Sequence, residues 1–120
     1  QASYLAVLEK LHEGVLLMDL RQRVTMLNAE AQRLTGWKLA ESLGQPAHRI
    51  LPLVADDGSS LADLCARAES AGDSLSFSVS GLIQVRGGAE RRVNGSLSLL
   101  REDSGAANAF AITFAERQDP

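Results

Sequence analysis

The sequence has few of the residues that build metal centres, disulfides or aromatic ligand sites. Among 120 residues there are five aromatic side chains, one cysteine, Cys65, and two histidines, His12 and His48. A single cysteine cannot form a disulfide within the chain, which favours a reducing compartment, and we expect a cytoplasmic location. Because one cysteine and two distant histidines give too few ligands for a zinc cluster, we expect no metal site.

Strong positive charge and long apolar runs are lacking as well. The net charge at pH 7 is -3, so bulk charge does not attract nucleic acid. The longest apolar run, residues 14–18, is far shorter than the roughly 20 residues of a membrane-spanning helix, and we expect no insertion into a membrane. The sequence starts without Met and without a signal-like segment, so we interpret it as one domain cut from a larger protein.

The first 13 residues have a helix-forming composition. Tyr4, Leu8, Leu11 and Val15 follow one another at intervals of four, three and four residues, which places them on one stripe of an amphipathic helix. The stripe either packs on its own domain or pairs with a second copy in a homodimer. These four residues are our candidates for the dimer contact.

Two short strands are predicted on either side of a polar turn. The first covers residues 14–19 and ends at Asp19, and the second covers residues 23–28 and ends at Asn28. An asparagine side chain can accept a hydrogen bond from a free backbone N–H in the first turn of a helix. Asn28 is therefore predicted to be the N-cap of a helix over residues 29–35.

Glycines and prolines mark the ends of three short helical turns. Gly36 ends the first, because glycine readily takes the left-handed conformation that closes a helix, and Gly44 ends the second. The third lies between Pro46 and Pro52. Such a curved segment is suited to covering a sheet, and we expect Trp37 to pack there rather than to contact a ligand.

A longer helix and three strands are predicted for the second half. The helix over residues 60–70 places Cys65 on its apolar face, as a small core residue. The strands follow over residues 75–86, 90–100 and 108–116. Gly87 and Gly88 form the turn between the first two, and Gly81 is interpreted as a bulge.

The polar and small residues of these strands alternate with the apolar ones. Asn94, Ser96 and Ser98 are expected on the face opposite the core, which is exposed or faces a partner. The last strand carries small residues on that second face, where a partner could approach closely: Ala109, Ala111, Thr113 and Ala115. Arg86, Arg91 and Arg92 are interpreted as a solvated turn, with a partner-binding rim as the alternative.

This order of elements resembles a PAS domain, over roughly residues 4–118. The resemblance rests on GVLLMDLRQRVTMLNAEAQRLTGWKLAESLGQP and on VRGGAERRVNGSLSLLRED. It implies an α+β fold with a five-stranded antiparallel sheet, short helices on one face and a cavity between them. A flanking helix over residues 1–13 would precede a PAS domain over residues 14–118. The positions that match the family pattern are Asp19, Asn28, Gly36, Trp37 and Gly44.

The resemblance also implies a function in signalling. RLTGWKLAESLGQP and ILPLVADDG are most similar to PAS segments of bacterial cyclic-di-GMP proteins, such as GGDEF-type diguanylate cyclases and phosphodiesterases, and of sensor kinases. We expect a non-enzymatic sensory and dimerisation module that passes the state of a ligand or partner to a C-terminal output domain. A sensor histidine kinase parent, or a sensor that binds flavin or haem, is the alternative.

Specific cofactor signals are weak. A haem would need an axial histidine, and His48 precedes the helix where haem-binding relatives place theirs, while His12 lies in the first helix. The flavin-photosensing branch has an Asn-Cys-Arg-Phe-Leu-Gln segment where this chain has AHRILPL. The family often ends its last strand with Asp, then Ile or Val, then Thr. This chain has Glu116, Arg117 and Gln118 there. We find no catalytic arrangement of residues.

Overall fold

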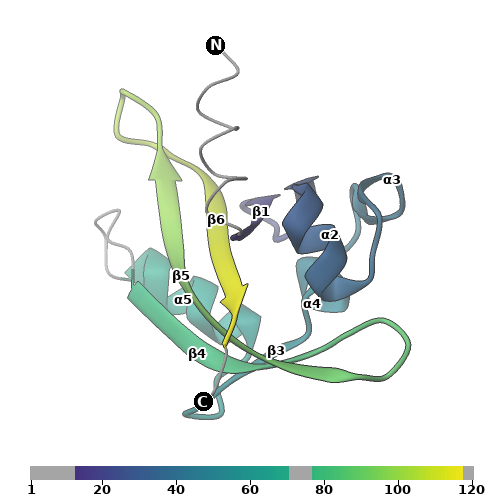
Figure 1. The fold of residues 1–120 in the computed structure, drawn as a ribbon. Coiled ribbons are helices and arrows are strands. Elements are labelled where there is room, and N and C mark those ends of the chain that lie inside the picture. Colours follow the sequence, from purple (N-terminus) through teal and green to yellow (C-terminus); the bar gives the residue numbers. More distant parts are fainter. Residues whose placement is uncertain (1–12, 71–76, 118–120) are drawn as a thin grey trace.

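One antiparallel sheet organises the chain. The computed structural model describes residues 13–70 and 77–117, and within them six strands follow the order β2-β1-β6-β5-β4-β3 (Figure 1). The strands are β1 (Gly14–Asp19), β2 (Val24–Leu27), β3 (Leu53–Ala55), β4 (Phe77–Gln84), β5 (Glu90–Arg101) and β6 (Ala107–Glu116). The first strand of the described chain therefore lies beside the last, in the middle of the sheet.

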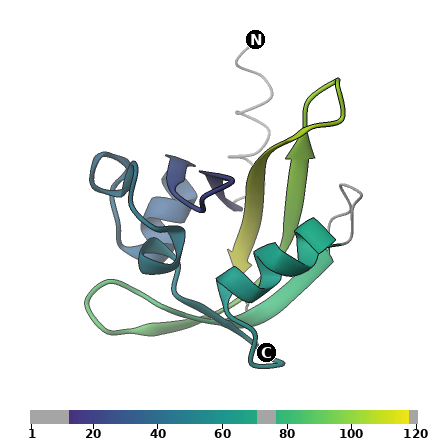
Figure 2. The same cartoon turned by 180° about the vertical axis from the view of Figure 1, so that it is seen from behind.

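Short helices pack against this sheet. In the described residues they are α2 (Ala29–Thr35), α3 (Leu39–Ser42), α4 (Ala47–Ile50) and α5 (Leu61–Ser70). The helix α2 contacts β1, α3 contacts β2, and α5 lies against β5, as Figure 2 shows from behind. We call α2, α3 and α4, with the residues that join them, the helical cover.

The expected α+β architecture is confirmed, with one difference. The sheet has six strands where five were expected, because β3 pairs with β4 through Leu53 and Ile83, Val54 and Leu82, and Ala55 and Gly81. No strand was predicted from the sequence in this region. Three residues after a proline are too few to show the alternation that identifies a strand.

The core lies between the sheet and the helices. Alternate residues of β5 and β6 point into it, and the largest side chains there, Phe110 and Phe114, are 0% and 1% exposed. The helices contribute Leu34, Ile50 and Leu64, which are also buried. Each such side chain stabilises the fold by about 1.5–3 kcal/mol through its removal from water, so the alternation seen in the sequence has a direct energetic basis.

The predicted turn between β4 and β5 is confirmed. Gly87 and Gly88 have φ values of 103° and 109°, in the region that favours glycine. The turn is closed by a hydrogen bond of 2.7 Å from the Val85 N–H to the Ala89 carbonyl oxygen. The two strands then pair without interruption from Gln84 and Glu90 onward.

The predicted bulge at Gly81 is wrong. Gly81 pairs regularly with Val93 on β5 and with Ala55 on β3. A Cβ atom at Gly81 would collide with the Val54 carbonyl oxygen and would lie 2.8 Å from the Ala55 Cα. Glycine is needed here because the backbone of β3 passes too close for any side chain.

Gly95 on β5 shows the same constraint in the centre of the sheet. It pairs with Phe114, and an added Cβ would collide with the Thr113 carbonyl oxygen and lie 2.9 Å from the Phe114 Cα. Replacing Gly95 by Ala should therefore lower the free energy of unfolding by about 3 kcal/mol or more, since backbone atoms cannot easily move aside. Urea denaturation of the variant measures this change.

Gly105→Ala is the matched control for this prediction. Gly105 has a φ of 90° but nothing within 4 Å of an added Cβ, so its replacement should cost only about 1–2 kcal/mol of backbone strain. Equal losses for the two variants would contradict the steric explanation for Gly95.

Candidate functional site

The side chain of Asn28 joins the start of β1 to the start of α2. Its Oδ1 accepts hydrogen bonds from the Val15 N–H at 2.8 Å and from the Ala31 N–H at 2.9 Å, and its Nδ2 donates to the Glu13 carbonyl oxygen at 3.0 Å. The Asn28 N–H also donates to the Val15 carbonyl oxygen at 3.0 Å. The predicted N-cap is confirmed, and the contacts to β1 are an addition that the sequence did not indicate.

Asp19 closes the turn between β1 and β2. Its Oδ1 accepts hydrogen bonds from the Arg21 N–H at 2.9 Å and from the Arg23 N–H at 3.0 Å. These bonds hold Gln22 at a φ of 64°, a conformation that residues with a side chain rarely adopt. Asp19 is thus a turn residue, within the pattern that the sequence shares with PAS domains.

Gly36 and Gly44 both adopt the left-handed conformation, with φ values of 80° and 77°. The Gly36 N–H donates to the Gln32 carbonyl oxygen and ends α2, as predicted. The Gly44 N–H donates to the Val24 carbonyl oxygen at 2.9 Å. Gly44 therefore returns the chain from α3 to the edge of β2.

Trp37 packs partly buried against the core, as expected from the sequence. Two guanidinium groups lie over its ring, with the Cζ atom of Arg86 4.1 Å and that of Arg49 5.7 Å from the ring centroid. Arg86 also donates to Glu41 at 2.7 Å. No local pattern in the sequence indicates this cluster, because Arg86 and Glu41 are 45 residues apart.

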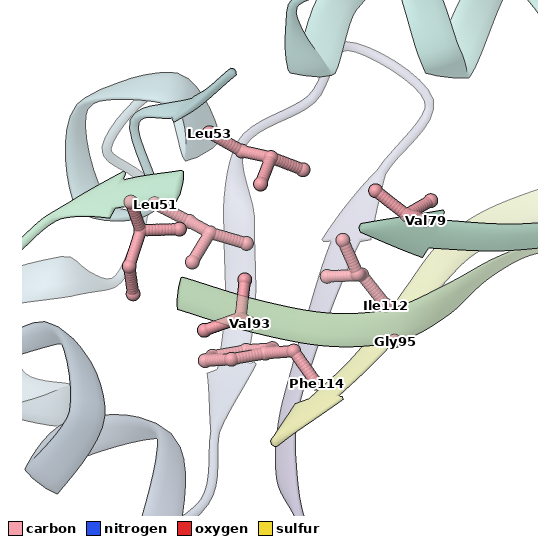
Figure 3. Close-up of a pocket in the computed structure, with 8 residues that line it drawn as sticks. Leu51, Leu53, Val79, Val93, Gly95, Ile112 and Phe114 are labelled. Carbon is pink, nitrogen blue, oxygen red and sulfur yellow. The ribbon is translucent and has the colours of Figure 1, made fainter. Parts of the chain in front are cut away.

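The expected cavity is very small. The space open to the centre of a water-sized sphere is about 10 Å³, near the lower limit for one water molecule. Figure 3 shows the apolar side chains that line it. The lining residues are Leu51, Leu53, Val79, Ile83, Val93, Gly95, Ile112 and Phe114. Sites that enclose small molecules or cofactors typically measure about 300–1,000 Å³, so this pocket is far smaller than such a site.

Of the two histidines, only His48 lies within the described residues. His48 lies on α4 with an exposed side chain, and it does not line the pocket. His12 lies outside the residues that the structure describes. The part of the chain that is described holds no group of three or more His, Cys, Asp or Glu side chains that could bind a metal ion.

The sheet has a second face, directed away from the helices. Asn94, Ser96 and Ser98 lie on it, as predicted, while Val93, Leu97 and Leu99 are buried in the core. We call this surface the outer face. It also carries the small residues of β6 that the sequence placed there: Ala109, Ala111, Thr113 and Ala115.

The middle of the outer face is built from small side chains that bond to one another. Ser96 and Thr113 are hydrogen-bonded at 3.0 Å, and the Ser80 hydroxyl donates to Asn94 at 2.9 Å. Larger apolar residues stand at one side, where Val54 and Leu82 are neighbours on β3 and β4 and are 56% and 36% exposed. This combination of small and apolar side chains allows close approach of another surface.

The candidate dimer residues fall mostly outside the described chain. Tyr4, Leu8 and Leu11 are among residues 1–12, which the structure does not describe. Val15 belongs to β1, pairs with Thr113 and is 5% exposed. It is therefore a strand residue of the outer face and not the end of a helical stripe.

The three arginines near the β4–β5 turn have different surroundings. Arg86 contacts Trp37 and Glu41, as described above, and Arg91 pairs with Glu116 at 2.9 Å. Arg92 is exposed, and its carbonyl oxygen accepts a hydrogen bond of 2.7 Å from the Arg117 N–H. The interpretation as a solvated turn fits the exposed Arg86 and Arg92, although Arg86 also contacts Trp37 and Glu41, whereas the Arg91 side chain is 29% exposed and ion-paired. The departure from the family pattern at Glu116 is accommodated by its ion pair with Arg91.

Comparison with known proteins identifies the family. The fold is an α+β domain with one covered and one open sheet face. A family model described as the PAS fold matches residues 8–120. The chain therefore belongs to the PAS family of sensory domains, as the sequence resemblance implied.

Solved structures share this fold at low sequence identity. A PAS domain from Colwellia psychrerythraea has a TM-score of 0.75 and 11% identity, with 96% of this chain and 94% of that chain covered. The PAS domain of nitrogen regulation protein NR(II) from Vibrio parahaemolyticus has a TM-score of 0.70 and 16% identity, with coverages of 93% and 95%. A light-oxygen-voltage domain studied with a flavin analogue has a TM-score of 0.71 and 14% identity, with coverages of 98% and 86%.

These structures share the fold of this chain. The search of curated proteins gave no match. Among the described helices, none is long and apolar enough to cross a membrane.

The Asn28 contacts predict a large loss of stability when the side chain is removed. Asn28→Ala leaves the N–H groups of Val15 and Ala31 without their acceptor, and should lower the free energy of unfolding by about 3 kcal/mol. Asn28→Asp keeps the acceptor but places a carboxylate oxygen against the Glu13 carbonyl oxygen, so it should cost about 1–2 kcal/mol, less than Asn28→Ala. Urea denaturation checks both values, and equal losses would contradict the proposed role of Oδ1.

Cys65 offers a second test. Burial in α5 raises the pKa of its thiol from 9.0 to about 12, so at pH 8 the native protein should react with iodoacetamide about 100-fold or more slowly than the urea-unfolded protein. Because the unfolded thiol ionises first, stability should fall as the pH rises above about 9. Equal labelling rates for the native and unfolded protein would show that Cys65 is accessible.

Proposed function

We propose that this PAS domain is a sensory and dimerisation module of a larger bacterial signalling protein, and that it responds to protein contacts at its outer face. The single observation that carries this proposal is the contrast between the two faces of the sheet. The face under the helices is closed around a space of about 10 Å³, whereas the outer face combines small polar side chains with the exposed Val54 and Leu82.

The closed interior argues against a tightly enclosed ligand. Phe114 and Ile112 fill the centre of the sheet and are each 1% exposed. A ligand of metabolite size would have to displace such side chains, which costs several kcal/mol of packing before any binding contact forms. Signalling through a protein contact needs no such displacement.

The outer face meets the physical requirements of a protein contact. Serine, alanine and threonine side chains let two backbones approach closely, and a hydrogen bond of 3.0 Å already joins the hydroxyl groups of Ser96 and Thr113. A partner therefore does not have to replace this hydrogen bond. We propose that the partner is a second copy of this chain, joined through this face and through the stripe of Tyr4, Leu8 and Leu11 beside Val15.

The parent protein is proposed from the sequence resemblance. We propose a cytoplasmic module of a cyclic-di-GMP enzyme, with a sensor histidine kinase as the alternative. In either case an output domain would follow β6, whose last residues are held to β5 by the ion pair between Arg91 and Glu116. A change at the outer face could then reach the output domain through β6, which contributes side chains to both faces of the sheet.

A cofactor-binding sensor is the second candidate. It is favoured by the structural similarity to a light-oxygen-voltage domain that has been studied with a flavin analogue. A bound flavin or haem would give the purified domain a visible absorption spectrum. A metabolite would instead stabilise the domain, by about 2.7 kcal/mol at a hundred times its Kd.

The proposed dimer predicts the effect of charges on the N-terminal stripe. The double variant Leu8→Glu, Leu11→Glu should raise the dimer Kd by about 100-fold or more, because carboxylates would have to be buried in the contact. Analytical ultracentrifugation should show the native sequence as a dimer and this variant as a monomer.

Leu43→Glu is the control for this prediction. Leu43 is 50% exposed and lies next to α3, on the helical side of the domain, so this variant should remain dimeric. An unchanged sedimentation coefficient for the double variant would reject the stripe as the contact, and a monomeric native protein would reject the dimer.

A further inference from the structure

The turn between β4 and β5 meets the helical cover at Arg86 and at the neighbouring Val85. The Arg86 N–H donates a hydrogen bond of 2.9 Å to the Thr35 carbonyl oxygen, at the end of α2. Gly36 lies directly beside it, and a Cβ there would be 3.1 Å from the Arg86 Cβ. The backbone of the turn is therefore packed against the end of α2.

The Arg86 side chain adds two contacts to the cover. Its Cζ atom lies 4.1 Å from the centroid of the Trp37 ring, and its Nη1 lies 2.7 Å from the Glu41 Oε1. The same Trp37 ring is approached by Arg49 from α4. One aromatic ring thus joins the β4–β5 turn to residues before α3 and on α4.

The side-chain contacts of Arg86 are exposed to solvent, so each of them is weak. The side chains of Arg86 and Glu41 are 45% and 44% exposed. An exposed ion pair and an exposed cation–π contact are each worth about 1 kcal/mol or less. The start of the cover is held by the partly buried hydrogen bonds of Asn28, and its far end by backbone hydrogen bonds from Gly44 to Val24 and from Ala47 to Gln22. These bonds are harder to break because their backbone groups would lose their partners.

The cover is therefore held firmly at its two ends and more weakly at Arg86, between them. We propose that Arg86 is a releasable latch, and that its release lets residues 35–43 move away from the β4–β5 turn while the sheet stays folded. Such a local opening needs much less free energy than global unfolding. The latch lies on the helical side of the sheet and does not depend on the proposed dimer.

The contacts of Arg86 are connected to the small pocket through Trp37 and α4. Leu51 lines the pocket and follows α4 directly, two residues after Arg49, which contacts Trp37. Release at Arg86 would free the Trp37 ring and loosen the segment that carries Leu51. The pocket would then be able to widen without any change at the outer face.

Hydrogen exchange of the intact chain tests this proposal. Arg86→Met keeps most of the side-chain length and removes the charge, so exchange at the Gly36 and Leu43 amides should become about tenfold faster. Amides of α5 and of the centre of β5 should change by less than about twofold. Trp37, the only tryptophan, should show altered fluorescence at the same time.

Two further variants make the result decisive. Arg91→Met removes the other arginine–glutamate pair of the same hairpin, and it should leave exchange at Gly36 and Leu43 unchanged. Glu41→Gln should accelerate exchange there, and should add little in the Arg86→Met background because both changes remove one contact. Unchanged exchange at residues 35–43 in Arg86→Met, or the same acceleration in Arg91→Met, would overturn the latch. If Arg86→Met does not fold, Glu41→Gln gives the same two outcomes alone.

Discussion

The side-chain amide of Asn28 connects three segments of backbone that the chain must bring together. It accepts hydrogen bonds from Val15 in β1 and Ala31 in α2, and it donates to Glu13 before β1. Since β2 ends one residue earlier, this one side chain fixes where the sheet stops and the helical cover begins. The direction of α2 across the sheet, and with it the position of α3 and α4, follows from this junction.

The helical cover that begins at this junction lies on one face of the sheet, so the two faces have different properties. The face under the cover is closed by large apolar side chains such as Phe110 and Phe114. The outer face carries the hydrogen-bonded pair Ser96 and Thr113 in its middle. Strand β6 contributes to both faces, because its residues alternate between them. A contact on the outer face and a rearrangement in the interior can therefore influence each other through this strand.

Local patterns in the sequence predicted the caps, turns and strands, because these features depend on residues that are close together in the chain. The cap at Asn28, the helix stop at Gly36, the turn at Gly87 and Gly88, and the alternation along β5 follow from backbone conformation or from burial of every second residue. Contacts between distant segments were not predicted. The close approach of β3 to Gly81 was interpreted as a bulge, and the contact of Arg86 with Trp37 and Glu41 has no local pattern.

The size of the pocket could not be predicted either, because it depends on how side chains from α4, β3 and the sheet fit together. A resemblance to PAS domains implied a cavity, but the number and size of apolar residues on both sides decide how much of it remains. Here Leu51, Val93 and Phe114 reduce it to about 10 Å³. The ligand class that a PAS domain can accept is thus a property of packing and not of the shared motif.

The most direct test of this account is native mass spectrometry of the freshly purified domain at low micromolar concentration. The account predicts a dimer whose mass is that of two chains, with nothing added. Reproducible extra mass on each protomer would contradict it, because the interior would then have to open around a ligand, and the identity of that mass would define the signal.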